Sequence, residues 1–131
     1  MLYSKETESI RVSVRPFYLE EESEPEMNHY CWAYHVRIEN RRSESVRLVG
    51  RLWRITDANG VVRRIKGAGV IGEQPVLAPG EVFEYTSGAP LPTCSGFMLG
   101  SYYMIGENGQ KLHIDIPEFS LDMPNVERVI N

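Results

Sequence analysis

Residues 67–88 read GAGVIGEQPVLAPGEVFEYTSG, and this stretch decides which fold the chain can adopt. Glycine reaches backbone angles that other residues avoid, and proline fixes its own φ angle. Four glycines and two prolines fall between residues 67 and 80, so this part must follow an irregular path rather than a helix. The next residues, Val82–Thr86, place Phe83 and Tyr85 on one face and therefore predict a strand.

The glycines at 67, 69 and 72 spell G-x-G-x-x-G, the pattern of a dinucleotide-binding turn. That turn must open a helix whose free N–H groups face the pyrophosphate. Pro75 and Pro79 exclude a useful helix here, and Glu73 adds a negative charge. An irregular strand with a turn at Pro79-Gly80 is favoured. Anion binding on the glycine N–H groups remains the alternative. The candidate binding residues are Gly67, Gly69, Gly72, Glu73, Gln74 and Pro75.

The chain outside this stretch reads as strands separated by turns. In residues 29–40, aromatic and β-branched side chains occupy alternate positions, so they should face the core. Gly50 interrupts another alternating segment and predicts a bulge. Asn59-Gly60 and Asn108-Gly109 predict hairpin turns, the first of type I′, and Pro117 should end the last strand. Further strands are expected at residues 9–18, 46–56, 61–66, 96–105 and 111–116, with a loop at 87–95.

These segments together predict an all-β protein, an antiparallel β-sandwich of seven or eight strands. No stretch has sustained helical periodicity. The 131 residues, 42% of them hydrophobic, suit a single domain spanning residues 1–131, with a frayed tail at 125–131. The expected interior consists of Trp32, Tyr34, Val36, Trp53, Phe83 and Tyr102.

The net charge of -4 argues against general binding to nucleic acid. Residues 37–66 nevertheless carry +6, while the rest carries -10. The arginines of this segment are interpreted as solvent-facing strand residues, although its positive charge would also attract an anionic partner. No apolar run reaches membrane length and no signal-peptide core begins the chain, so a cytoplasmic protein is expected. Cys31 and Cys94 are expected to be buried thiols.

Neither a metal site nor a catalytic site is predicted. His29, Cys31 and His35 share one face of a strand, but the two histidines lie about 20 Å apart along it and cannot bind one ion. The acidic run at residues 20–26 is expected to be a mobile loop, and it lacks the central glycine of a calcium loop. No G-x-S-x-G elbow is present, and His113, like the other histidines, falls on a predicted strand. No cofactor is expected.

When the residues between and beyond the glycines are compared as well, the chain resembles the ApaG family, also called CorD. The pattern G-x-G-V-[VI]-G-E-Q-P-x-L-x-P-G-x-x-F-x-Y-x-S covers Gly67 to Ser87, and the resemblance extends over about residues 12–124. Leu52 departs from it, because many members carry His there, so no chemistry of that His is carried over. Other matching positions are Trp32, Ala33, Tyr34, Ile38, Asn40, Trp53, Thr56, Asp57, Gly60, Gly96, Met98, Gly100, Tyr102, Ile116, Pro117, Phe119 and Leu121.

The resemblance implies a sandwich like immunoglobulin and fibronectin type III domains, without an established catalytic activity. It also implies a link to cobalt and magnesium tolerance and a gene beside that of a diadenosine tetraphosphate hydrolase. Related domains occur in eukaryotic F-box and polymerase-interacting proteins, where the implied role is protein binding. The sequence thus favours a non-enzymatic module for protein–protein interaction, with small-anion or nucleotide binding at Gly67–Gly72 as the alternative. An unidentified protein partner is expected, and exposed strand edges also allow a homodimer.

Overall fold

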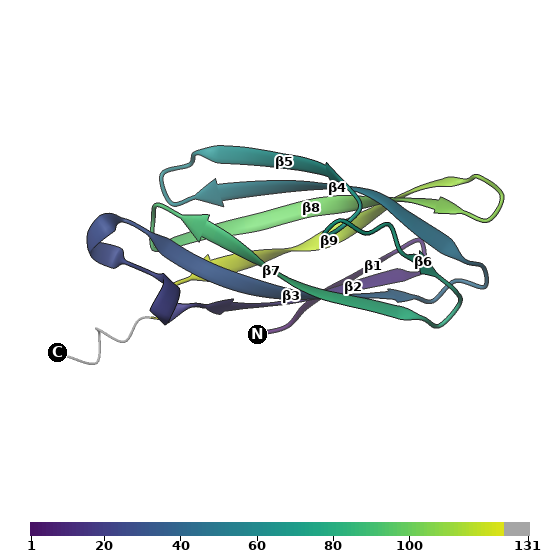
Figure 1. The fold of residues 1–131 in the computed structure, drawn as a ribbon, viewed down its shortest axis with the longest axis horizontal. Helices are drawn as coiled ribbons and strands as arrows, with labels where there is room; N and C mark the ends of the chain where they lie inside the picture. Colours follow the sequence, from purple (N-terminus) through teal and green to yellow (C-terminus); the bar gives the residue numbers. More distant parts are fainter. Residues whose placement is uncertain (125–131) are drawn as a thin grey trace.

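Two antiparallel sheets pack face to face in the computed structural model, which describes residues 1–124 (Figure 1). The all-β sandwich expected from the sequence is therefore confirmed. The first sheet has the order β1-β2-β3-β7, with strands at Tyr3–Thr7, Ile10–Tyr18, Tyr30–Asn40 and Val82–Leu91. The second has the order β5-β4-β8-β9, with strands at Val62–Ala68, Val46–Asp57, Ser95–Gly106 and Lys111–Asp122, and β6 (Val76–Leu77) also pairs with β4.

The core forms where the inward faces of the sheets meet. Strand β3 buries Trp32, Tyr34, Val36 and Ile38, as its alternation predicts. Trp53 and Tyr102 are buried against them from the second sheet, whereas Phe83 is only partly buried. The aromatic rings of Tyr34, Trp53 and Phe119 pack on one another with centroids 5.2–5.9 Å apart, so they join the two sheets.

The described residues form nine strands rather than seven or eight. The two additions are β1 and the two-residue β6, which are too short or too polar to show clear alternation. The acidic run forms two short 3₁₀ turns, Glu20–Glu22 and Pro25–Met27, between β2 and β3. The predicted tail, residues 125–131, lies outside the described residues.

Two strands run on through prolines that were expected to stop them. Strand β7 continues to Leu91 because it is an edge strand, paired only with β3, where Pro90 need not donate a ladder hydrogen bond. Strand β9 continues through Pro117, since the register shifts there and Pro117 and Glu118 together oppose Leu99. A proline is tolerated in such a bulge because one bulged residue is left unpaired.

The Asn-Gly hairpin turns occur where expected, but the first is not of type I′. At Asp57–Gly60 only Gly60 has a positive φ, and its N–H donates to the Asp57 carbonyl. This is a type I turn followed by a left-handed glycine. The Asp57 carboxylate favours it, because Oδ1 accepts the N–H groups of Asn59 and Val61 at 2.8 and 3.0 Å.

Candidate functional site

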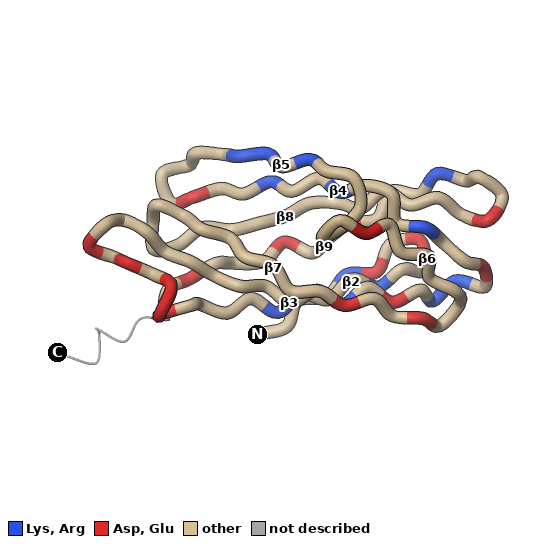
Figure 2. Tube along the Cα trace, viewed as in Figure 1, with Lys and Arg blue, Asp and Glu red and all other residues tan. Residues whose placement is uncertain are grey.

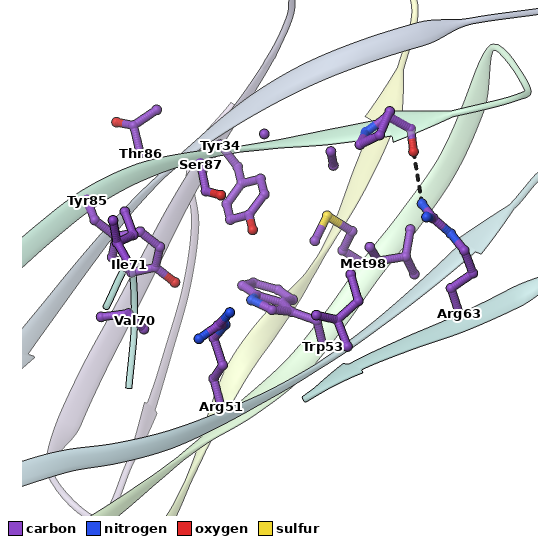
Figure 3. Close-up of a pocket in the computed structure, with 15 residues that line it drawn as sticks. Tyr34, Arg51, Trp53, Arg63, Val70, Ile71, Tyr85, Thr86, Ser87 and Met98 are labelled. Atoms are coloured by element: carbon purple, nitrogen blue, oxygen red, sulfur yellow. Dashed lines mark hydrogen bonds between the residues drawn. The ribbon is translucent and has the colours of Figure 1, made fainter. Parts of the chain in front are cut away.

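A groove opens on the side of the sandwich where edge strands β5 and β7 face each other. The opposite side is closed, because β9 packs against β1 and β2. Between β5 and β7 lies a cavity of about 420 Å³ whose floor includes Tyr34, Trp53 and Met98 (Figure 3). The inward residues of β7 beside it are small, Ser87 and Ala89, and they leave this space unfilled. We call it the β5–β7 groove.

A charged side chain, Arg51, lies on the inner side of the sandwich at one end of this groove. The pairing of β4 with β8 shifts register between Leu48 and Gly50, which is the bulge that Gly50 predicted. After the bulge the inward positions are Arg51, Trp53 and Ile55, so the arginine occupies a core-facing position. Arg51 is half-buried and points into the groove beside Trp53 (Figure 3).

The glycine stretch holds this arginine in place. Gly67 on β5 is directly opposite Arg51 on β4, so both positions face inward. A Cβ at position 67 would lie 2.8 Å from Nη1 of Arg51, which means that the guanidinium occupies the space left by the missing side chain. Nη1 also donates a hydrogen bond to the carbonyl of Gly69 at 2.7 Å. The first two glycines of the motif thus position a cation inside the protein.

The rest of the motif forms a tight two-residue hairpin. Val70 and Glu73 exchange N–H···O bonds of 2.8 Å in both directions, and the Gly69 N–H donates to the Val49 carbonyl at 3.0 Å. Ile71 and Gly72 at the tip both have positive φ, 47° and 73°. The N–H groups of residues 69, 70 and 73 are therefore engaged within the protein, which removes them as donors to an external anion.

Of the remaining predicted site residues, Gly72 and Glu73 are exposed, whereas Gln74 and Pro75 hold the glycine stretch against β4 by hydrogen bonds. The side chain of Glu73 is exposed, as is Gly72. Gln74 ties the segment to the bulge of β4, because its Nε2 donates to the Val49 carbonyl at 3.1 Å. Pro75 does the same through its carbonyl, which accepts the Leu48 N–H at 3.0 Å.

Three buried tyrosines form a hydroxyl cluster next to Arg51. The hydroxyls of Tyr85 and Tyr102 share a short hydrogen bond. Burial raises the pKa of all three tyrosines above the ordinary value, strongly for Tyr102. A hydrogen bond with Ser87 and the positive charge of Arg51 oppose the rise in the pKa of Tyr34. These hydroxyls are therefore neutral donors and acceptors at physiological pH. Tyr34 and Tyr85 line the same groove as Arg51, and Tyr102 lies fully buried behind them.

A second arginine crosses the groove at its other end. Arg63 on β5 donates from Nη2 to the carbonyl of Pro90 on β7 at 2.9 Å, shown as the dashed line in Figure 3. Beyond it a further hollow of about 450 Å³ continues between the same elements and is lined by Asp57, Leu91 and Pro92. The two hollows share Ile55, Arg63 and Pro90, so they form one continuous groove with a bridge across it.

The charges are distributed unevenly around this groove. Figure 2 shows Lys and Arg along β5 and β4 and acidic residues in the turns between β2 and β3. His35 lies outside the groove and contacts Glu84 and Thr86 at 2.7 and 2.8 Å, whereas His29 lines the second hollow and lies 3.2 Å from the Cys31 sulfur. Within residues 1–124 no group of three or more His, Cys, Asp or Glu side chains is placed to hold a metal ion.

None of the six residues predicted as a binding site lines the groove. Gly67 and Gly69 contact Arg51, which does line it, but Arg51, Tyr34 and Ser87 were not among the candidates. The signal for Arg51 was the Gly50 bulge, which moves the arginine onto the same face as Trp53. In the part of the chain that the structure describes, no helix is long and apolar enough to span a membrane.

Comparison with known proteins places this architecture in one family. The model of the ApaG domain matches residues 20–106. Protein ApaG of Rhodospirillum centenum is 58% identical over 124 residues, 95% of each chain, and that of Brucella canis is 55% identical over 130 residues, 99% of this chain and all of the relative. The crystal structure of a Bordetella pertussis protein described as ApaA superposes with a TM-score of 0.87 at 49% identity, covering 89% of this chain and 95% of that one.

Proposed function

Because the chain belongs to the ApaG family, whose members named above carry no catalytic activity in their names, we propose that it is a non-enzymatic binding module. It would receive a segment of another protein in the β5–β7 groove. The observation that supports this most directly is the groove itself, which lies between two edge strands with free edges. Exposed strand edges and apolar grooves are the surfaces on which sandwich domains accept peptide segments.

The alternative, anion or nucleotide binding at Gly67–Gly72, has less support. The N–H groups of Gly69, Val70 and Glu73 already donate to protein carbonyls, and Arg51 occupies the space beside Gly67. The cobalt and magnesium tolerance implied by the resemblance would be an indirect effect, exerted through the protein partner.

Site-specific photo-crosslinking tests the proposed docking surface. A p-benzoylphenylalanine at Ile71, which lines the groove and is 56% exposed, should crosslink to a defined protein species in cell extract. The same group at Arg54, an exposed position on the outer face of β4, is the matched control and should not. Identical products from both positions, or none from Ile71, would contradict docking in the groove.

The exposed tip of the glycine stretch gives a second test. Replacing Glu73 by alanine is expected to weaken capture of the partner while leaving the melting temperature unchanged, because its side chain is exposed and makes no ion pair within residues 1–124. Gln74→Ala should also weaken capture, but with a small loss of stability, since it releases the hydrogen bond to the Val49 carbonyl. Unchanged capture by both variants would remove the tip from the docking surface.

A further inference from the structure

We propose that the β5–β7 groove accepts an extended peptide segment bearing an Asp or Glu side chain, and that Arg51 is the receptor for that carboxylate. This rests on the proposed function and names the chemistry of its partner. The first argument is the state of Arg51. Arg51 is half-buried on the inner side of a strand, yet within residues 1–124 no carboxylate lies within 4.0 Å of its guanidinium.

An unneutralised cation in this position is unusual, because partly desolvated charges are normally paired. The hydrogen bond from Nη1 to the Gly69 carbonyl uses one of the five N–H donors of a guanidinium. Some arginines are paired: Arg42 contacts Glu44 at 3.1 Å, and Arg37 contacts Glu39 at 3.2 Å. The other arginines without an ion pair within residues 1–124 are exposed to solvent, unlike Arg51: Arg15, Arg47, Arg54, Arg63 and Arg64. Arg51 therefore retains both the charge and the geometry to bind a carboxylate.

The lining of the groove restricts the rest of the ligand. Beside Arg51 the surface offers the hydroxyls of Tyr34 and Ser87, which are able to hydrogen-bond a carboxylate or the adjoining backbone. The neighbouring lining is apolar, with Trp53, Met98 and Ile65. A small inorganic anion would leave this apolar part unfilled, whereas an acidic residue flanked by apolar residues matches both parts.

The length of the groove favours a peptide. It continues past the Arg63 bridge into the second hollow, and its two walls are strand edges. Side chains on one face of an extended chain repeat about every 7 Å, so such a segment presents several to one groove. The acidic residue belongs at the Arg51 end, because Asp57 lies six residues away, about 20 Å along β4, in the other hollow.

Selection from a library of random peptides tests this chemistry directly. The wild-type protein is the bait, and Arg51→Gln is used for counter-selection. We expect the enriched peptides to share one Asp or Glu flanked by apolar residues. In a synthetic copy of the best peptide, replacing this acid by its amide should weaken binding to the wild-type protein by about tenfold to a hundredfold, since a charge-assisted hydrogen bond is lost. This arm leaves the protein unaltered, so folding does not affect it.

Two protein variants complete the design. Arg51→Gln should weaken binding of the acidic peptide by a similar factor and should bind the amide peptide no worse than the wild type does. Arg54→Gln removes a neighbouring arginine on the outer face of the same strand and should change the affinity by less than about twofold. The melting temperature of each variant is measured alongside.

Three outcomes would overturn the inference: enriched peptides without a shared acidic residue, equal binding of the acid and the amide, or no enrichment over the Arg51→Gln bait. The proposed function is judged separately by crosslinking. If Ile71 crosslinks to a partner but no acidic peptide is selected, docking in the groove stands and the carboxylate receptor fails. If neither is observed, both fail.

Discussion

Replacing Gly69 by alanine is expected to lower the free energy of unfolding by about 3 kcal/mol or more. The new Cβ would lie 2.0 Å from the carbonyl oxygen of Glu73, and the φ of +64° is unfavourable for any L side chain. The hairpin between Val70 and Glu73 would have to open, which would expose the fully buried Val70. The Gly69 carbonyl that holds Arg51 would move as well.

Gly72→Ala is the matched control for this prediction. Gly72 has a similar φ of +73°, but nothing lies within 4 Å of the position its Cβ would take. Its substitution should therefore cost only the backbone strain, about 1 kcal/mol. Urea unfolding of both variants measures the difference. Equal losses would show that the close approach to Glu73 does not matter and that the hairpin adapts freely.

Alkaline conditions are expected to unfold the protein steeply, because Tyr34, Tyr85 and Tyr102 are buried and neutral. Burial raises the pKa of each in the folded state, so above about pH 10 the unfolded chain loses protons that the folded chain keeps. Stability is then fully present below about pH 10 and falls as the pH rises toward the folded pKa values. Each group contributes a slope of about 1.4 kcal/mol per pH unit.

Urea unfolding at several alkaline pH values measures this slope. Tyr85→Phe should lower stability at neutral pH, because Tyr102 loses its hydroxyl partner, yet it should make the alkaline slope shallower by one group. Tyr103→Phe removes an exposed hydroxyl and should leave the slope unchanged. If the unfolding free energy fell with pH equally steeply in the Tyr85 variant and in the wild type, the tyrosine cluster would not be the cause of alkaline unfolding.

Most of the fold followed from local rules. The alternation in residues 30–40 predicted which face is buried, and Gly50 and the two Asn-Gly pairs predicted the bulge and the turns. The errors came from prolines, because a proline ends a strand only where its missing N–H would be needed. Whether it is needed depends on the neighbour: Pro90 is on an edge strand and Pro117 is in a bulge, and neither fact is local.

The site was harder to predict for the same reason. The glycine motif is visible in the sequence, but its role depends on what lies opposite. Gly67 leaves room for Arg51 only because β4 and β5 pair in one particular register. The hydroxyls of Tyr34 and Ser87 come together through another pairing, between β3 and β7. Such a site is a product of strand register, which single-sequence patterns do not specify.

The bulge between Leu48 and Gly50 makes this part of the chain sensitive to length rather than to composition. Straightening the bulge with all its residues kept would turn every later position of β4 over, because alternation continued from Leu48 places the even-numbered positions inward. Leu52 and Arg54 would then face inward, while Arg51 and Trp53 would face solvent. Substitutions on the outer face should be tolerated, but one residue inserted directly after the bulge, between Gly50 and Arg51, would turn both Arg51 and Trp53 outward and so remove the charged groove and the core anchor together. We therefore expect natural variants to keep the number of residues between the bulge and the Asp57 turn.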